Sequence, residues 1–188
     1  MNTLPVTAGE ATPENLKEPF RRTLRHSNRS GICAAVRITE FLKLDAVVSQ
    51  LNAKTKSDVL SELAASVSRV TPSVPLNRIH EVLSEREKIG STGMEKGVAI
   101  PHGRLSELAD LVACFGVSKQ GIDFDARDGR PSHFFFALVA PENSAGVHLK
   151  ALSKVSRLFR SDSLRDSILA ANTREEIYAL IAQEDARA

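Results

Sequence analysis

The most informative part of the sequence is a histidine between a proline and a glycine, Pro101-His102-Gly103, preceded by a short apolar run. Proline cannot donate to a strand ladder and keeps Ile100 extended, so we expect a strand to end there. Glycine then permits a tight turn with little steric cost. This pattern predicts that His102 lies on a turn at the carboxyl end of a strand, where open α/β sheets often build their sites.

A histidine in that position suits reversible phosphoryl transfer. The imidazole pKa is ordinarily about 6.5, so a neutral ring nitrogen is available as a nucleophile at physiological pH. Histidine also forms covalent intermediates that remain reactive, which a phosphoryl relay requires. The alternative is that His102 only makes a hydrogen bond within the turn.

Two further residues supply what a phosphoryl-accepting histidine needs. Arg86 carries a permanently charged planar fork that can hold two phosphate oxygens. His148 lies near the start of a predicted helix opened by Ser144 or Gly146, where free amides and the helix dipole favour an anion. Both residues also have plainer interpretations, Arg86 as part of a solvated helix face and His148 as a surface or capping residue.

The other histidines have no such setting. His26 lies near the N-terminus, His80 falls inside a predicted helix and His133 begins an apolar run, so we interpret all three as structural. A metal site from His102, His133 and His148 is conceivable, but no HExxH motif or paired-cysteine spacing accompanies it. No Walker loop or dinucleotide fingerprint occurs either. We therefore expect no cofactor, and a phosphoprotein rather than ATP as the phosphoryl donor.

The elements that must position these residues follow from apolar spacing. Helical spacing predicts helices over 57–70, capped by Ser57, and over 75–89. Apolar runs bounded by glycine and proline predict buried strands at 98–100, 112–117 and 134–139. The C-terminal part returns to helices, with a core stripe of Leu149, Leu152, Val155 and Phe159, then 164–168, then a helix after a Thr173/Glu176 capping box.

Composition limits the class of protein. The 188 residues, 42% of them hydrophobic, suffice for one substantial core and are few for two domains. The net charge of +2 does not favour a nucleic-acid surface. No segment approaches the roughly 18 apolar residues of a membrane span, and the N-terminus lacks the apolar run of a signal peptide. We therefore expect a cytoplasmic protein without membrane insertion.

Residues 1–35 differ from the rest of the chain. They are rich in Pro, Thr, Ser, Asn and charge and show no apolar period, which predicts a disordered N-terminal extension. A basic arm for DNA or anionic lipid is an alternative, although three acidic residues accompany its five basic ones. Another alternative is a natural start near Val36, where patterned sequence begins. The folded domain is expected over 36–188.

Several stretches of the sequence together carry a family resemblance. They are 85–93 (EREKIGSTG), 97–103 (GVAIPHG), 121–126 (GIDFDA) with 128–129, 136–141 (FALVAP), and 148–149 with 152–153. They resemble the mannitol/fructose-type IIA (EIIA) components of the bacterial sugar phosphotransferase system, and most closely the nitrogen-regulatory IIA proteins (EIIA-Ntr). The similarity covers roughly residues 36–184.

The resemblance implies a single α/β domain whose mixed β-sheet is flanked by helices. It implies that His102 is the phosphorylated histidine and that Arg86 and His148 support it. The donor would be an HPr-like histidine phosphocarrier (NPr), itself charged from phosphoenolpyruvate by an enzyme I homologue. Nitrogen-type members typically act on potassium transporters, kinases and metabolic control according to their phosphorylation state.

Three hypotheses about function follow. The first is a regulatory phosphocarrier whose partners sense the charge on His102. The second is an EIIA component of a fructose/mannitol-type uptake system that passes the phosphoryl group to an EIIB protein. The third is a binding module whose histidines are structural and whose contacts ignore phosphorylation.

Overall fold

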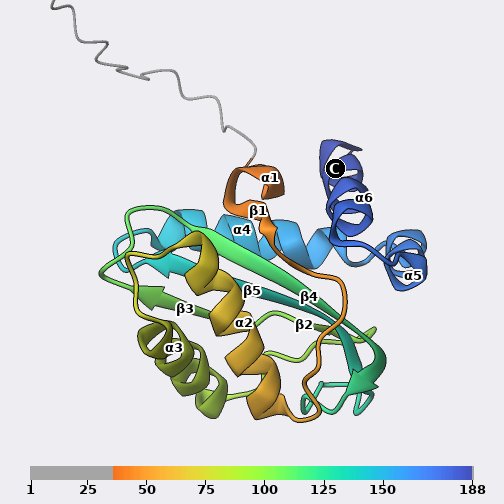
Figure 1. Ribbon diagram of the computed structural model, residues 1–188, viewed down its shortest axis with the longest axis horizontal. Coiled ribbons are helices and arrows are strands. Elements are labelled where there is room, and N and C mark those ends of the chain that lie inside the picture. Colours follow the sequence, from red (N-terminus) through yellow and green to blue (C-terminus); the bar gives the residue numbers. More distant parts are fainter. Residues whose placement is uncertain (1–35, 188) are drawn as a thin grey trace, which may run out of the picture. The chain divides into compact units, whose positions relative to one another are not determined.

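The computed structural model describes residues 36–187 (Figure 1). The predicted extension over 1–35 lies outside these described residues, and the domain boundary at 36 stays a prediction. The elements are α1 (Ile38–Phe41), β1 (Leu42–Val48), α2 (Lys56–Val70), α3 (Leu76–Ile89), β2 (Val98–Ala99), β3 (His102–Leu105), β4 (Val112–Ile122), β5 (Ser132–Pro141), α4 (Ala145–Leu158), α5 (Asp162–Ala170) and α6 (Arg174–Arg187). Among these helices, none has the length and apolar character needed to cross a membrane.

The sheet is mixed and has five strands in the order β1, β4, β5, β2, with β3 also paired to β5. β1 runs parallel to β4, β4 is antiparallel to β5, and both β2 and β3 are parallel to β5. Val98 lies opposite Phe134 and His102 opposite Leu138, so β2 and β3 form one edge strand in a constant register. The prediction of a single α/β domain with a mixed sheet flanked by helices is therefore confirmed.

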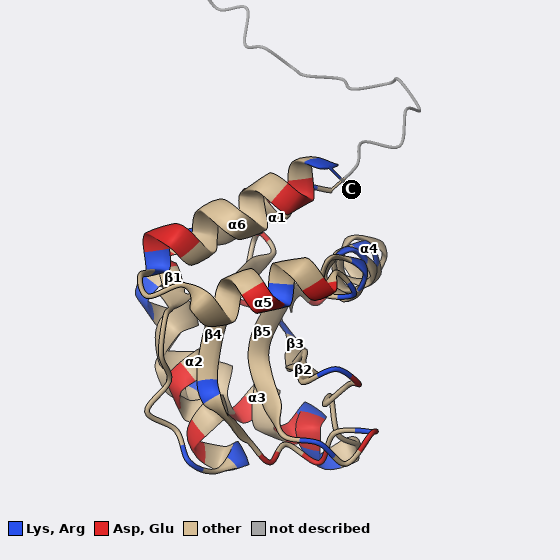
Figure 2. Cartoon of the chain, turned by 90° about the vertical axis from the view of Figure 1, so that its right-hand side faces the viewer, with Lys and Arg blue, Asp and Glu red and all other residues tan. Residues whose placement is uncertain are grey.

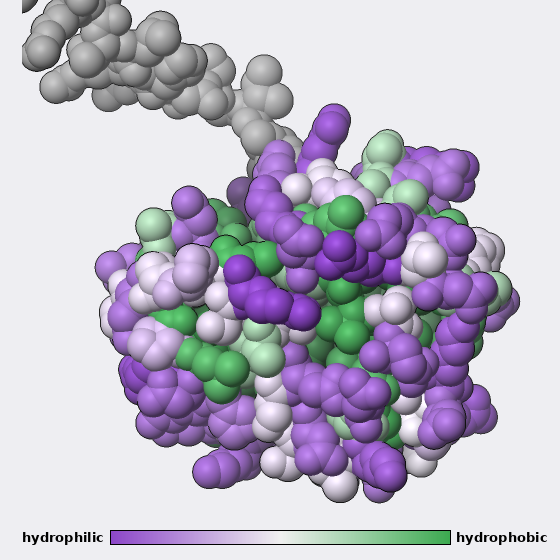
Figure 3. Space-filling model, in the orientation of Figure 1, coloured by the Kyte–Doolittle hydropathy of each residue, from purple (hydrophilic) through white to green (hydrophobic). Residues whose placement is uncertain are grey.

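Strand β5 separates two hydrophobic cores because successive side chains point to opposite faces of a sheet. Phe134 and Phe136 join the core that packs against α4, α5 and α6. Phe135 and Val139 join the core that packs against α2 and α3, the two helices in front of the sheet in Figure 1. Strand β5 carries no Lys, Arg, Asp or Glu (Figure 2). In Figure 3 polar side chains surround smaller apolar patches on the visible face.

Capping boxes begin two of the helices. The cap of α2 is Thr55 and not the predicted Ser57, because Thr55 has Asp58 three residues on and the two side chains satisfy each other's backbone amides. Ser57 has no acidic residue at that spacing. The predicted box of Thr173 with Glu176 at the start of α6 is confirmed.

Helix α4 buries a different stripe from the predicted one. The buried residues are His148, Ala151, Val155 and Leu158, whereas Leu149 is 66% exposed. The predicted core stripe was therefore wrong at its first position, because periodicity alone cannot distinguish a buried leucine from an exposed one. The consequence is that His148 lies on the side of α4 that faces the domain.

Candidate functional site

His102 is the first residue of β3, so the prediction that it lies on a tight turn was wrong. Pro101 interrupts the ladder but not the register, and its carbonyl still accepts from the amide of Leu138 at 2.9 Å. Gly103 is needed for a close approach, because a Cβ there would lie 2.1 Å from Cγ1 of Val82 in α3. This close packing of α3 on β3 brings the last turn of α3 beside His102.

Both ring nitrogens of His102 have partners. Nδ1 lies 2.8 Å from the carbonyl oxygen of Ile100, and because that oxygen can only accept, Nδ1 carries the proton. Nε2 then presents its lone pair and accepts a hydrogen bond from Nε of Arg86 at 3.3 Å. In the neutral ring, Nε2 is therefore the nitrogen that can act as a nucleophile.

The surroundings of His102 favour this neutral form. Partial burial lowers the pKa of His102 below its usual value, and the guanidinium groups of Arg86 and Arg104 lower it further. The hydrogen bond to the Ile100 carbonyl and the charge of Glu87 act in the opposite direction without reversing the result. At physiological pH the lone pair on Nε2 is consequently available.

Arg86 projects from the last turn of α3 and is held at two points. Its Nε donates to His102, and its Nη1 donates to the carbonyl oxygen of Gly90 at 2.9 Å. The position of the guanidinium group thus depends on the loop that begins at Gly90. Nη2, the remaining nitrogen of the fork, makes no hydrogen bond within residues 36–187.

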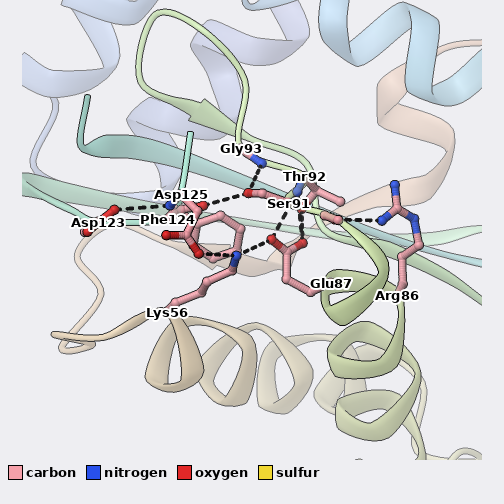
Figure 4. Close-up of polar contacts among 10 residues, drawn as sticks. Lys56, Arg86, Glu87, Ser91, Thr92, Gly93, Asp123, Phe124 and Asp125 are labelled. Atoms are coloured by element: carbon pink, nitrogen blue, oxygen red, sulfur yellow. Dashed lines mark hydrogen bonds and ion pairs between the residues drawn. The ribbon is translucent and has the colours of Figure 1, made fainter. Parts of the chain in front are cut away.

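A buried carboxylate, Glu87, ties that loop to the rest of the domain (Figure 4). It accepts hydrogen bonds from the hydroxyl and, at 3.0 Å, the amide of Thr92. It also pairs with Nζ of Lys56 at 2.7 Å, and Lys56 pairs in turn with Asp125 at 2.9 Å. The side chains of Arg86 and Glu87 leave the same turn of α3 in different directions. Arg86 contacts His102, whereas Glu87 holds the loop after Gly90.

His148 faces His102 from α4, with the two ring centroids 5.5 Å apart and the rings edge to face. Its Nδ1 accepts from Nε of Arg104 at 3.4 Å, so the proton lies on Nε2. That Nε2 is buried and has no hydrogen-bond partner among the described residues. Because an unpaired buried donor is costly and rare, its presence beside His102 marks a position for an acceptor.

The imidazole of His148 is neutral at physiological pH because its pKa is lowered. Burial first, then repulsion from His102 and Arg104, lowers the pKa of His148 to about 4.

Sequence reasoning missed Arg104, although it follows His102 by two residues and strand alternation puts both on one face. The mistaken turn at Pro101 concealed that signal.

The structure thus brings together the three predicted site residues, His102, Arg86 and His148. It leaves the other described histidines elsewhere, since Nδ1 of His133 bonds to the Ser118 carbonyl at 3.0 Å and His80 lies along α3. His26 lies outside the described residues. Within 36–187 no group of three or more His, Cys, Asp or Glu side chains is arranged to hold a metal ion.

Comparison with known proteins agrees with the resemblance found in the sequence. Residues 40–184 match the model of the family described as the phosphoenolpyruvate-dependent sugar phosphotransferase system, EIIA 2. The nitrogen regulatory protein of Bradyrhizobium diazoefficiens is 36% identical over 151 residues, which cover 80% of this chain and 98% of that protein. The fructose-specific EIIABC component of Bacillus subtilis is 31% identical over 150 residues, or 80% of this chain and 24% of that protein.

A solved structure gives the same result. The crystal structure of the nitrogen regulatory protein IIA-Ntr from Neisseria meningitidis matches this fold with a TM-score of 0.71 and 35% sequence identity. The match covers 76% of this chain and 97% of that one. The chain therefore belongs to the EIIA 2 family of the phosphoenolpyruvate-dependent sugar phosphotransferase system, whose members carry phosphoryl groups on histidine.

Proposed function

We propose that this chain is a regulatory phosphocarrier of the nitrogen-regulatory IIA type and that Nε2 of His102 accepts the phosphoryl group. The observation that carries the proposal is the hydrogen bonding of this ring. Nδ1 holds its proton against the Ile100 carbonyl, while the lone pair on Nε2 is directed at the guanidinium group of Arg86. This is the arrangement that a neutral histidine nucleophile requires.

In the proposed step, Nε2 attacks the phosphorus atom of a phosphohistidine on the donor protein. A bond forms between Nε2 and phosphorus, and the bond from phosphorus to the donor nitrogen breaks, its electron pair returning to that nitrogen. His102 keeps the proton on Nδ1, so its ring becomes cationic. The hydrogen bond from Nδ1 to the Ile100 carbonyl favours that charge and keeps the phosphoryl group transferable.

Arg86 and His148 would hold the phosphoryl oxygens. Phosphoryl transfer depends mainly on positioning and on donors aimed at developing negative charge. The guanidinium group of Arg86 already donates to Nε2 of His102. The ring of His148, whose Nε2–H has no partner among the described residues, has its centroid 5.5 Å from that of His102. Arg104 sets the tautomer of His148 and adds a second positive charge beside the site.

Exposed apolar residues that are close in sequence to the site residues support a protein as the donor. Ile89 is 85% exposed and follows Arg86 by three residues, and Leu149 is 66% exposed and follows His148 directly. Exposed apolar side chains of this kind suit docking by a partner protein. We propose an HPr-like phosphocarrier charged by an enzyme I homologue as that partner, in the cytoplasm.

The relatives favour regulation over sugar uptake. The nitrogen regulatory protein of B. diazoefficiens is matched over nearly its whole length, whereas the fructose-specific relative is matched over 24% of its length. The second candidate function, transfer to an EIIB protein during sugar uptake, rests on the similarity to that fructose-specific protein. The regulated targets would be proteins such as kinases or potassium transporters.

The test is intact-mass analysis after incubation with phosphoenolpyruvate, an enzyme I homologue and the histidine carrier. We expect an acid-labile phosphoryl adduct on the wild type and on His80→Ala, and none on His102→Ala. An adduct that persists in His102→Ala would contradict the assignment. No adduct on any variant, with the carrier shown to be charged, would support the binding-module hypothesis. Adding an EIIB protein then separates uptake, in which the adduct is discharged, from regulation.

A further inference from the structure

A cavity of about 950 Å³ lies between loop 91–96 and the C-terminal half of α4. It begins at Arg86 and His102 and extends to Arg160, beyond the end of the helix. Lys96 in the loop pairs at 3.2 Å with Asp162, the first residue of α5, which follows α4. The volume lies in the range of small-molecule sites, about 300–1,000 Å³, and greatly exceeds the space that one phosphoryl group on His102 needs.

The loop wall of this cavity is fixed before any ligand arrives. The amide of Met94 bonds to the Val98 carbonyl at 2.7 Å, and the amide of Ile100 bonds to the Thr92 carbonyl at 3.1 Å. Gly93 packs so closely on the 124–126 segment that a Cβ there would lie 2.8 Å from Cα of Ala126. Binding would therefore require little ordering of this wall, which favours affinity.

The helix wall presents hydroxyl groups that the fold does not use. Helical serines often donate to the carbonyl four residues earlier, and Ser61, Ser66 and Ser167 do so here. Ser153 and Ser156 line the cavity and make no side-chain hydrogen bond within the described part of the chain. Their hydroxyl groups are free to bind a ligand.

Two arginines at the cavity are likewise unused. Arg127 lies in the loop between β4 and β5, and Arg160 lies just after α4. Both are exposed, and neither side chain has a hydrogen bond or ion pair among residues 36–187. Two acidic residues line the cavity, and one of them, Asp125, is paired with Lys56. Among the described residues, one unpaired negative charge, that of Glu95, therefore stands beside the two unpaired positive charges of the arginines. The unpaired charge of the lining is therefore positive.

We propose that this cavity binds a small organic phosphate. Arg127 and Arg160 would hold its phosphate group, because planar guanidinium forks match phosphate oxygens, and the hydroxyl groups of Ser153 and Ser156 would complete the donors. The remainder of the ligand would pack against an apolar floor of Val98, Ile100, Leu152 and Phe159. The proposal goes beyond phosphoryl transfer, since it does not require that His102 be phosphorylated.

The experiment is titration of the isotope-labelled protein with glycerol 3-phosphate, glucose 6-phosphate and AMP, followed by NMR, with inorganic phosphate and glucose alongside. We expect at least one ester to bind with a Kd of about 1 mM or tighter and to shift the amide signals of Ser153 and Ser156. Inorganic phosphate should bind more weakly than that ester, because it cannot fill the apolar floor. Glucose, which lacks the phosphate, should not bind.

Matched variants decide whether the cavity is responsible. Arg127→Gln/Arg160→Gln should weaken binding at least tenfold, because charge-assisted hydrogen bonds are lost. Arg130→Gln/Arg157→Gln removes one exposed arginine from the same loop as Arg127 and one from the last turn of α4, both outside the cavity lining. This variant should change the Kd less than about twofold. The titrations use the unphosphorylated protein with no phosphoryl donor present, so failure here is separable from failure of phosphorylation. The proposal is overturned if no ester binds, or if the two double variants lose affinity equally.

Discussion

The two histidines of the site differ in how completely their hydrogen bonds are satisfied. His102, on β3, is half-buried and has a partner on each ring nitrogen. His148, on α4, is only 4% exposed, yet its Nε2–H has no partner within residues 36–187. The lone pair on Nε2 of His102 is directed at Arg86, as the proposed nucleophile requires, whereas Nε2–H of His148 has no acceptor among the described residues. This difference is consistent with the proposed function, in which a phosphoryl group is bound at the site and later released.

The largest expected effect is on the rate of phosphorylation and comes from replacing Arg86, the residue that donates to Nε2 of His102. Arg86→Gln deletes the charge that touches Nε2 of His102, and we expect phosphorylation to slow by about 100-fold, as for loss of a preorganised donor. The measurement is the rate of adduct formation from the charged carrier. Lys88→Gln, an exposed cation in the same turn, is the control and should change the rate less than about twofold. Equal rates in the two variants would contradict the role of Arg86.

The next effect tests what holds Arg86 in place. Glu87→Gln keeps the shape of the side chain but breaks its ion pair with Lys56, and we expect the free energy of unfolding to fall by about 2 kcal/mol. Urea denaturation measures this loss, and Glu85→Gln, an exposed neighbour, should change stability by less than about 0.5 kcal/mol.

Glu87→Gln also tests whether Glu87 affects phosphorylation only through the position of Arg86. Because Glu87 acts on the site through the loop that holds Arg86, Glu87→Gln should slow phosphorylation in the wild type and add nothing in the Arg86→Gln background. The loss of stability should be the same in both backgrounds. Independent, additive slowing in the double variant would show that Glu87 does not act through Arg86.

These contacts also show what the sequence could predict. The short spacings around Arg86 and His102 and the resemblance were sufficient to name three residues that the structure brings together. The network around Glu87 was not predictable, because it joins Lys56, Thr92 and Asp125 through loop geometry that no local pattern encodes. Arg104 was missed because a proline in the edge strand was interpreted as its end.

Replacing His148 should have a smaller effect than replacing Arg86. It should slow phosphorylation without lowering the stability of the domain. His148→Phe keeps an aromatic ring but removes the donor, so phosphorylation should slow about tenfold, the equivalent of about 1.4 kcal/mol. The free energy of unfolding should stay the same or rise, because a buried unpaired donor is removed. Parallel rate and urea measurements test both parts. Loss of stability without loss of rate would make His148 an ordinary structural residue.

The smallest effect is a pH dependence of stability that arises mainly from His148. Burial holds the pKa of His148 at about 4, below its ordinary value of 6.5, so protons bind the unfolded chain more tightly. The stabilising contribution is therefore complete above pH 6.5 and is lost as the pH falls towards 4. Between pH about 6.5 and about 5.5 it should fall by about 1 kcal/mol.

The lowered pKa of His102 acts in the same direction, so wild type and His148→Phe must be compared. Urea denaturation across this range should show a shallower loss of stability in His148→Phe than in the wild type, since one of the two depressed histidines is gone. Glu85→Gln, at an exposed position of α3 that makes no hydrogen bond or ion pair with either ring, should reproduce the wild-type slope. If His148→Phe also reproduces it, then His148 is not held neutral by burial, and the contrast between a satisfied and an unsatisfied histidine loses its electrostatic basis.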